Sequence, residues 1–330
     1  MSVTIRRVVV DHPQVVRVER AELPDVPAAG QTRVRPRAIG ICGSDLHVLA
    51  GHHPFVRYPV HPGHELVGEV EAVGDHVDEA WIGRRVVLEP GLSCGECRSC
   101  LRGDRHLCET LRVMGFQVPG GMADAFDAPL DRLHRLPDSI PSEQGALVEP
   151  LAVATHAVRL AGDLAGRDVL VVGAGPIGVA CALVARADGA SVTVADVDPQ
   201  RRSVAVERFG MAVTAAGEGS GFDLAFECVG VEPALRSAIA AIRKGGMVMV
   251  VGVHGSDARI QAGSIQDREL TLRGTLMYQS QDVVRAIELL EHGAVDGGAW
   301  VDARVPLERT AEGYALAAAG GAVLKVLLIP

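Results

Sequence analysis

Short alternating runs of apolar and polar side chains characterise the first half of the chain. Residues 32–37 and 65–73 alternate in this way, which is typical of half-buried β-strands. Proline and glycine interrupt the chain repeatedly, and no long helical period appears before residue 142. This part of the sequence therefore predicts a mostly-β domain built from short strands and turns.

The pattern changes from about residue 152, where apolar strand-like runs alternate with helix-like segments. The strand-like runs are residues 168–172, 191–195, 222–226, 247–251 and 269–276. A helix-like segment follows the first run up to residue 187, and further ones cover residues 199–209, 233–242 and 282–291. This alternation predicts an α/β domain with a parallel sheet covered on both faces. The final run, 324–329, is also strand-like and can return to either domain.

Length and composition indicate a folded protein of two domains. The chain has 330 residues, of which 48% are hydrophobic. Its 41 acidic and 32 basic residues give a formal charge of −9, which argues against nucleic-acid binding. The apolar N-terminal run is cut short at residues 11–13, so no signal peptide is predicted. We therefore expect a cytoplasmic protein.

One uncharged stretch, residues 169–185, has almost the length of a membrane span. It contains three glycines and one proline, so a strand, a glycine turn and a buried helix explain it better. No membrane segment is predicted.

The glycine turn has the spacing of a dinucleotide-binding motif. Gly173, Gly175 and Gly178 follow a strand and open a helix, so that the backbone can approach a pyrophosphate at the helix N-terminus. Asp196 ends the next strand, where a carboxylate binds the adenosine ribose and repels a 2′-phosphate. We expect NAD as the cofactor, although Arg201 and Arg202 lie close enough in the sequence to hold the phosphate of NADP.

Seven cysteines in a chain without an export signal favour metal binding over disulfides. Four of them lie within fifteen residues, and four thiolates suit a closed, tetrahedral zinc site that stabilises the fold. An iron–sulfur cluster is the alternative, but the last spacing differs from the bacterial ferredoxin pattern. The four predicted structural zinc ligands are Cys94, Cys97, Cys100 and Cys108.

A second group of candidate ligands mixes a thiolate, an imidazole and carboxylates. Cys42, His64 and Glu65 would leave one zinc position open, as a catalytic site requires. Glu149 supplies a further carboxylate where the pattern changes. Cys181 and Cys228 fit buried core positions, and Cys228 is also close to the expected cofactor site.

These motifs together resemble the zinc-dependent medium-chain alcohol dehydrogenases over essentially the whole chain. The residues that carry the resemblance are the segment from Gly40 to His47, Gly63-His64-Glu65, the four-cysteine loop, Glu149-Pro150 and the glycine turn. Glu149, where simple alcohol dehydrogenases place a cysteine, makes the chain similar to the polyol and sugar-acid branch, with its sorbitol and idonate dehydrogenases.

The resemblance implies a GroES-like catalytic domain and a Rossmann domain. We expect the first at residues 1–151, with residues 292–330 returning to it, and the second at residues 152–291. It also implies two zinc ions per chain and a homodimer or homotetramer. The residues then expected to contact NAD are Gly173, Gly175, Pro176, Ile177, Gly178, Asp196, Arg201, Cys228, Val229, Val251, Gly252 and Val253.

By the same resemblance, Cys42 and His64 bind the catalytic zinc, and the order of Glu65 and Glu149 as ligands stays open. Ser44 would take the proton of the substrate alcohol, and His47 would pass it to solvent. The implied activity is hydride transfer between NAD and a polyol, a sugar acid or a cyclitol. The substrate pocket is expected around Ser44, residues 52–58, Phe116 and residues 277–278.

Two other functions remain open on the sequence. The substrate could be threonine, butanediol or an aminocyclitol of an antibiotic pathway. A cofactor-binding relative without activity is disfavoured, because the zinc ligands and the relay hydroxyl of Ser44 are all present.

Overall fold

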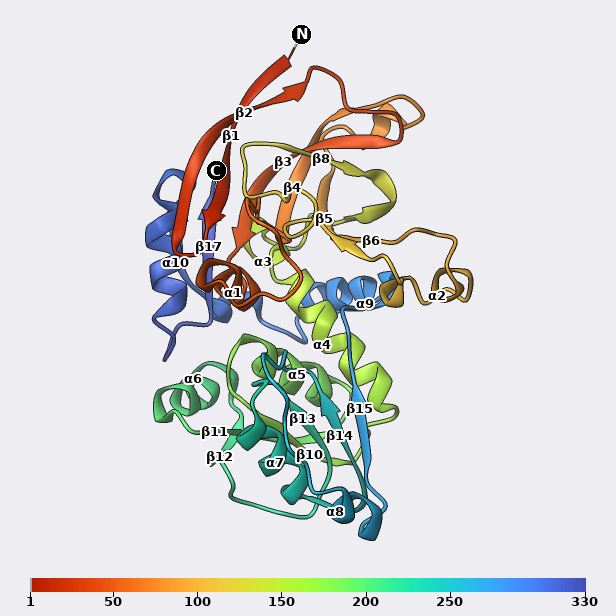
Figure 1. The fold of residues 1–330 in the computed structure, drawn as a ribbon, viewed down its shortest axis with the longest axis vertical. Helices are drawn as coiled ribbons and strands as arrows, with labels where there is room; N and C mark the ends of the chain where they lie inside the picture. The colour runs from red at the N-terminus through yellow and green to blue at the C-terminus, as the bar shows by residue number, and fades with distance from the viewer. Residues whose placement is uncertain (1) are drawn as a thin grey trace. The chain divides into compact units, whose positions relative to one another are not determined.

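The computed structural model describes residues 2–330 and divides into two compact units, each considered by itself (Figure 1). The first unit comprises the described residues up to Glu149, together with Gln279–His292 and Asp296–Pro330. The second comprises Pro150–Tyr278 and Gly293–Val295. The C-terminal strand therefore returns to the first unit, which settles the alternative that the apolar run left open.

The first unit contains a mostly antiparallel sheet in the order β16-β17-β3-β4-β5-β9, with β8 paired to β3. A hairpin of β1 and β2 lies outside this sheet. The strands are β1 (Ser2–His12), β2 (Val15–Pro24), β3 (Gln31–Gly40), β4 (Glu65–Val73), β5 (Arg85–Leu88), β6 (Gly91–Leu92), β7 (Arg112–Val113), β8 (Phe126–Pro129), β9 (Leu133–Arg135), β16 (Val301–Pro306) and β17 (Lys325–Ile329). The predicted mostly-β architecture is confirmed.

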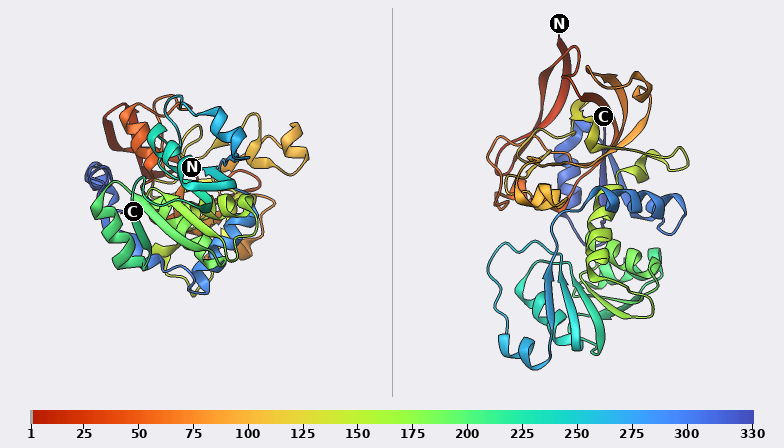
Figure 2. Two further views of the ribbon diagram at one scale, coloured as in Figure 1. Left: turned by 90° about the horizontal axis from the view of Figure 1, so that it is seen from below. Right: turned by 90° about the vertical axis from the view of Figure 1, so that its right-hand side faces the viewer.

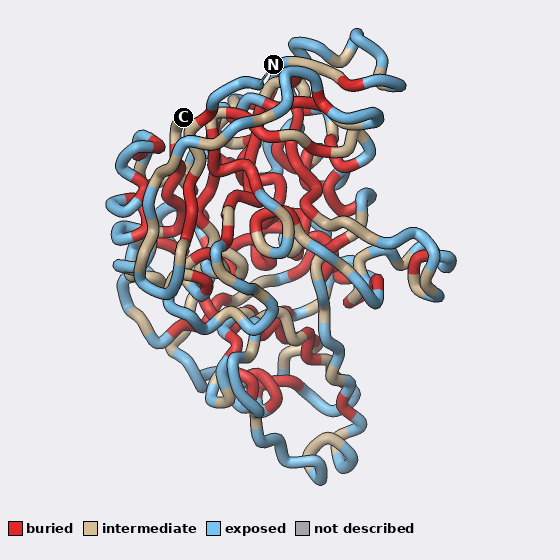
Figure 3. Tube along the Cα trace, turned by 45° about the horizontal axis from the view of Figure 1, so that its top comes forward, coloured by how far each residue is buried: buried red, intermediate tan, exposed pale blue. Residues whose placement is uncertain are grey.

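Short helices complete the first unit. They are α1 (Gly43–Ala50), α2 (Arg98–Leu101), α3 (Ser142–Gly145), α9 (Ser280–Glu291) and α10 (Thr310–Ala318). The helix α1 was not predicted, because its eight residues are too few to show a period. Buried positions are red in Figure 3. The core cluster of the first unit includes Val34 of β3, Leu66 of β4 and Val86 of β5, because alternate residues of a strand face the same side of the sheet.

The second unit is built on a six-stranded parallel sheet in the order β12-β11-β10-β13-β14-β15 (Figures 1 and 2). This is the doubly wound sheet that the sequence predicts. Its strands are β10 (Asp168–Val172), β11 (Ser191–Asp196), β12 (Ala212–Ala215), β13 (Phe222–Glu227), β14 (Ile242–Val250) and β15 (Thr271–Gly274). Its helices are α4 (Val148–Ala161), which starts in the first unit, α5 (Pro176–Ala187), α6 (Pro199–Phe209), α7 (Glu232–Ala241) and α8 (Ala262–Asp267).

Alternate residues of β10 show that the sheet is covered on both faces. Leu170 and Val172 belong to the core cluster formed with Leu235 of α7. Val171 faces the opposite side, where its Cγ1 lies 3.4 Å from the position that a Cβ on Gly178 of α5 would occupy. A strand buried on both faces explains the continuous apolar run of residues 169–172.

None of the helices formed by residues 2–330 is long and apolar enough to cross a membrane. The uncharged stretch 169–185 consists of the end of β10, the glycine turn and most of α5.

Helix α9 differs from the predicted domain division, because the sequence pattern placed residues 282–291 with the second domain. The structure groups α9 with the first unit. Ser280 donates to the Glu89 carboxylate, Gln279 Nε2 lies 3.3 Å from His106 Nδ1, and Ser139 Oγ donates to Glu291 at 3.2 Å. These polar contacts come from loops far away in the sequence, so the helical pattern alone could not reveal them.

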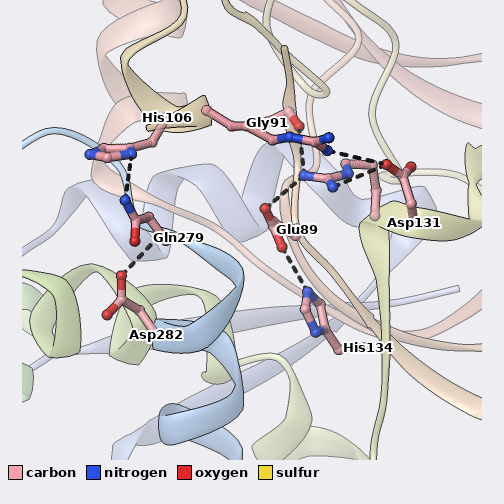
Figure 4. Close-up of polar contacts among 9 residues, drawn as sticks. Glu89, Gly91, His106, Asp131, His134, Gln279 and Asp282 are labelled. Atoms are coloured by element: carbon pink, nitrogen blue, oxygen red, sulfur yellow. Dashed lines mark hydrogen bonds and ion pairs between the residues drawn. The ribbon is translucent and has the colours of Figure 1, made fainter. Parts of the chain in front are cut away.

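Glu89 has its own polar contacts in this region (Figure 4). It accepts hydrogen bonds from Arg132 Nη1 and His134 Nε2, both at 2.7 Å, and its side chain is 8% exposed. Burial opposes its charge, but the hydrogen bond from His134 and the charge of Arg132 lower the pKa of Glu89 below its ordinary value of 4.5.

We predict that Glu89→Gln lowers the free energy of unfolding by about 1–3 kcal/mol at pH 7. Since the folded-state pKa is depressed, the carboxylate stabilises fully above pH 4.5, and this contribution is lost as the pH falls through the folded value. Urea unfolding of both proteins from pH 7 to pH 3 should show the difference shrinking on acidification. Asp138→Asn, at a fully exposed carboxylate, is the control, and an equally small effect of both variants would contradict the prediction.

Candidate active site

Cys42 lies directly before α1, at the N-cap position of the helix. Its backbone is extended (φ −90°, ψ 156°), and its N–H donates to Asp45 Oδ2 at 2.9 Å. Asp45 is completely buried, so this carboxylate fixes the turn that presents the Cys42 thiol. The helix N-terminus favours the thiolate form of Cys42, whereas burial and the Glu65 charge oppose it and raise the pKa of the thiol.

The pairing of β3 with β4 brings two further ligands to Cys42. Gly40 at the end of β3 pairs with Glu65 at the start of β4, and a Cβ on Gly40 would lie 2.3 Å from Glu65 Oε2. One ligand atom from each of Cys42, His64 and Glu65 lies within 4.8 Å of the others. The structure thus assembles three of the four residues that the sequence predicted for the reactive metal.

The chemistry of this trio fits a zinc ion. A thiolate, an imidazole and a carboxylate are zinc ligands, and three of them leave one position open. Glu65 Oε1, His64 Nδ1 and Asp45 Oδ1 are buried without a hydrogen-bond partner among residues 2–330. Burying a carboxylate oxygen without a partner is costly, and a bound cation removes that cost for Glu65.

Lys325, which the sequence analysis did not single out, faces the same carboxylate. Its Nζ lies 2.5 Å from Glu65 Oε2 and 3.4 Å from the Ile41 carbonyl oxygen, and both charged side chains are at most 2% exposed. Burial alone would lower the pKa of Lys325, but the charges of Glu65 and Cys42 raise it above its ordinary value. The lysine therefore holds one oxygen of Glu65 and leaves Oε1 available to a metal.

Glu149 lies in the first turn of α4 and is buried. Its charge acts on His64 and Lys325, raising the pKa of both, but it does not belong to the trio of ligand atoms. Ser44 Oγ lies 3.5 Å from His64 Nε2. His47, one turn further along α1, is exposed to solvent. Ser44 is half-buried, so the two residues follow each other from the site towards solvent, and the proton path through them stays a prediction.

In the absence of a metal, burial and neighbouring charges shift the pKa values of Cys42 and His64. Burial, followed by the charge of Glu65, raises the pKa of the Cys42 thiol. Burial alone would lower the pKa of His64, but the facing Asp45 carboxylate and the Cys42 thiol raise it well above its ordinary value. A divalent cation reverses this situation, because it stabilises the thiolate and the neutral imidazole as ligands.

The four clustered cysteines converge as the sequence predicts. Their sulfur atoms lie within 4.8 Å of one another, with Cys97 and Cys100 3.5 Å apart and Cys94 and Cys108 also 3.5 Å apart. The backbone N–H of Cys94 donates to Cys108 Sγ, and that of Cys97 donates to Cys94 Sγ. Such donors stabilise thiolates, and the backbone N–H groups of Glu96 and Cys97 lower the pKa of Cys94 to about 6. Four sulfur ligands fit a closed zinc site.

The glycine turn between β10 and α5 has the geometry that a dinucleotide requires. Gly173 has φ +105°, which favours glycine. A Cβ on Gly178 would lie 1.7 Å from the Gly173 carbonyl oxygen, so only glycine allows this close packing. A Cβ on Gly175 would meet only Arg201 Nη1, at 3.7 Å, and would otherwise fill open space beside the helix N-terminus. That open space fits a pyrophosphate.

Asp196 ends β11 and is directed at this turn. Its Oδ2 accepts from the Ala174 N–H at 2.7 Å, and its Oδ1 accepts from the Asp198 N–H at 2.8 Å. Arg201 Nη1 lies 4.0 Å from Oδ2. Asp198 caps α6 by accepting from the Gln200 N–H. Asp196 therefore braces the turn in addition to the ribose contact predicted for it.

Glu227, at the end of β13, is a second residue that the sequence analysis missed. Its Oε1 accepts from the N–H groups of Val229 and Gly230, and its carbonyl oxygen accepts from those of Val251 and Gly252. It thereby joins the two loops that carry the remaining predicted cofactor residues. Cys228 is half-buried, whereas Val229 and Val253 are 47% and 66% exposed.

The signal for the missed residues was present but weak. Lys325 is the one charged residue in the apolar run 324–329, and Glu227 follows the buried strand 222–226. A charge next to a buried strand needs a partner. The partner of Lys325 lies 260 positions away, so the sequence could not identify it. The Glu227 carboxylate accepts from N–H groups only two and three residues further along the chain, but the link of its carbonyl oxygen to the loop after β14 is not local.

Comparisons with known proteins cover both units. The sequence model of the alcohol dehydrogenase GroES-like domain matches residues 28–138, and that of the zinc-binding dehydrogenase matches residues 176–292. L-galactonate-5-dehydrogenase of Escherichia coli (strain K12) is 31% identical in an alignment of 324 positions that covers 94% of each chain.

Two solved structures extend the similarity over nearly the whole chain. A zinc-binding dehydrogenase from Sinorhizobium meliloti 1021, bound to NADP, has a TM-score of 0.91 and 30% identity, and the match covers 99% of this chain and 100% of that chain. A protein described as a short chain alcohol dehydrogenase from E. coli CFT073, complexed with NADH, has a TM-score of 0.92 and 25% identity, with 99% of each chain covered.

The Lys325–Glu65 pair leads to a prediction on stability. Lys325→Met leaves the Glu65 charge buried and unpaired, so we expect the metal-free protein to lose about 3–5 kcal/mol of unfolding free energy. The loss should be smaller in zinc-loaded protein, because the metal neutralises Glu65. Urea unfolding with and without a chelator measures both values.

The double variant Lys325→Met with Glu65→Gln serves as the control, since it removes both charges. It should recover most of the stability that Lys325→Met loses. Wild-type stability of the metal-free Lys325→Met protein would contradict the role assigned to this pair.

Proposed function

We infer that this chain, which belongs to the family of zinc-dependent alcohol dehydrogenases with a GroES-like domain, is an oxidoreductase that transfers a hydride between a secondary alcohol and NAD. The observation that carries the proposal is the trio of Cys42, His64 and Glu65, in which Glu65 Oε1 is buried without a hydrogen-bond partner within residues 2–330. A structural role for the trio would not require a carboxylate oxygen to be buried unpaired.

A zinc ion bound by Cys42, His64 and Glu65 would act as a Lewis acid and lower the pKa of the alcohol, and a bound nicotinamide would accept the hydride. The chain supplies the route for the proton. Ser44 Oγ, close to His64, accepts the hydroxyl proton of the substrate and releases its own toward His47. His47 is exposed and can pass this proton to solvent.

Glu65 and Glu149 have different proposed roles at the metal. Glu65 is assigned as the third zinc ligand through Oε1, because its other oxygen is held by Lys325. Glu149 is assigned a secondary role at the metal. Its charge raises the pKa of His64, and its carboxylate can replace Glu65 as a zinc ligand or orient a ligand in the open position. Cys94, Cys97, Cys100 and Cys108 would hold the second zinc, which stabilises the loop between β6 and β7.

NAD is the proposed cofactor. Asp196 places a carboxylate at the end of β11, and this charge opposes the 2′-phosphate of NADP. Arg201 nearby partly offsets it. One similar structure holds NADH and another NADP, so the fold itself accepts both.

The proposed substrate is a polyol, a sugar acid or a cyclitol. Support comes from Glu149 in place of a cysteine and from the similarity to a protein named for L-galactonate. Threonine, butanediol or an aminocyclitol is the second candidate, and no feature of the structure favours it over the first. We further propose a cytoplasmic homodimer or homotetramer.

The test of the proposed function is NAD⁺ reduction at 340 nm with sorbitol, idonate, galactonate, threonine, butanediol and inositol, together with zinc analysis of the same sample. We predict turnover of at least one polyol or sugar acid with about two zinc ions per chain, and with about one in Cys42→Ala. Cys42→Ala should lose turnover but retain NAD binding. Cys181→Ala, at a buried cysteine outside both clusters, should keep both zinc ions. Two zinc ions in Cys42→Ala would contradict the assignment.

Asp196 provides a separate prediction on cofactor choice. Asp196→Asn keeps an acceptor for the Ala174 N–H but removes the charge that opposes a phosphate, so the preference for NAD over NADP should fall by roughly tenfold or more. Fluorescence titration with both reduced cofactors measures the ratio. Asp198→Asn, at the neighbouring helix cap, should leave the ratio unchanged. An equal shift of the ratio in both variants would show that the Asp196 charge does not determine the preference for NAD over NADP.

A further inference from the structure

A row of three rings extends from the predicted zinc ligand His64. Phe116 lies against His64 with ring centroids 4.9 Å apart, and it stacks on His53 at 4.6 Å with an angle of 18° between the planes. Both Phe116 and His53 are half-buried. One edge of the candidate active site is therefore an aromatic wall that ends in a second imidazole.

The loop that carries His53 is held in place at several points. Gln117 Nε2 donates to the Phe55 carbonyl oxygen at 2.9 Å, and Gln117 Oε1 accepts from the Val113 N–H. Val56 and Tyr58 pack with Phe116 against the buried side chains of Val10, Val48 and Val60. The position of the His53 ring is thus determined by packing and is not left to a free surface loop.

The hydrogen bond of His53 indicates which ring nitrogen carries the proton. Its Nδ1 accepts from the Phe55 N–H at 3.4 Å. In the neutral imidazole the proton is then on Nε2, which makes no hydrogen bond to any residue that the structure describes. Burial, with the charges of His47 and His64, lowers the pKa of His53. The ring is accordingly neutral at pH 7 and offers one N–H donor.

We propose that His53 is a specificity-determining residue, whose Nε2–H donates to an oxygen on a carbon remote from the reacting one. A whole phenyl ring separates His53 from His64, so the hydroxyl next to the reacting carbon is too close to the metal site to be this acceptor. A chain of five or six carbons carries such a remote oxygen, whereas butanediol and threonine do not reach so far. The inference rests on the proposed function and narrows its substrate class to compounds with an oxygen remote from the reacting carbon, such as polyols and sugar acids, and away from butanediol and threonine.

The experiment compares sorbitol, gluconate and 2,3-butanediol as substrates of wild type, His53→Phe and His53→Gln. His53→Phe keeps a ring to stack on Phe116 but loses the donor, so KM for sorbitol and gluconate should rise by roughly 10–100-fold with kcat nearly constant. The constants for butanediol should change by less than about threefold. His53→Gln retains an N–H donor and should recover part of the affinity.

His292→Phe, at an exposed imidazole on the end of α9, controls for the change of residue type. Equal losses on all three substrates in His53→Phe would show a structural effect and overturn the inference. So would unchanged KM for sorbitol and gluconate. A wild-type enzyme that oxidises only butanediol would also overturn it while leaving hydride transfer intact, whereas inactivity on every alcohol would overturn the proposed function as well.

Discussion

The buried ion pair between Glu65 and Lys325 is the interaction on which the candidate active site depends. The two residues lie 260 positions apart, and the pair connects β4 with the C-terminal strand β17. Two charges inside a protein stabilise it only while each keeps its partner, because an isolated buried charge is strongly destabilising. The strand β17 must therefore pair with β3 before the trio of Cys42, His64 and Glu65 is electrostatically complete.

The same rule explains the other buried carboxylates. The Asp45 carboxylate fixes the turn at Cys42, that of Asp196 fixes the glycine turn, and that of Glu227 fixes the loop after β13, each by accepting backbone N–H groups. In all three cases a charge that would be costly in a core is used to shape an irregular backbone segment. In both units, a buried carboxylate thus fixes the backbone of a loop that carries predicted metal or cofactor ligands. The atoms of the loop that face away from the carboxylate stay available for the metal or cofactor.

Local patterns allowed much of this to be predicted. The parallel sheet, the glycine turn and the four-cysteine loop are each contained in a short stretch of sequence, where spacing alone identifies them. The boundaries of short elements were less accessible: α1 has only eight residues, and the edge strand β12 only four. Lys325 and the ring row from His64 to His53 require contacts between distant segments, which no periodicity encodes. Helix α9 shows the same limit, since its polar contacts within the first unit involve residues far away in the sequence.

The central claim is that Lys325 holds one oxygen of Glu65 while the other oxygen binds zinc beside Cys42 and His64. Anomalous scattering at the zinc edge from crystals of the purified protein tests it most directly. The account predicts two zinc ions per chain, one among the four thiolates and one about 2.0–2.3 Å from Cys42 Sγ, a His64 nitrogen and Glu65 Oε1. A single zinc among the thiolates, with Glu65 bound to Lys325 alone, would contradict it.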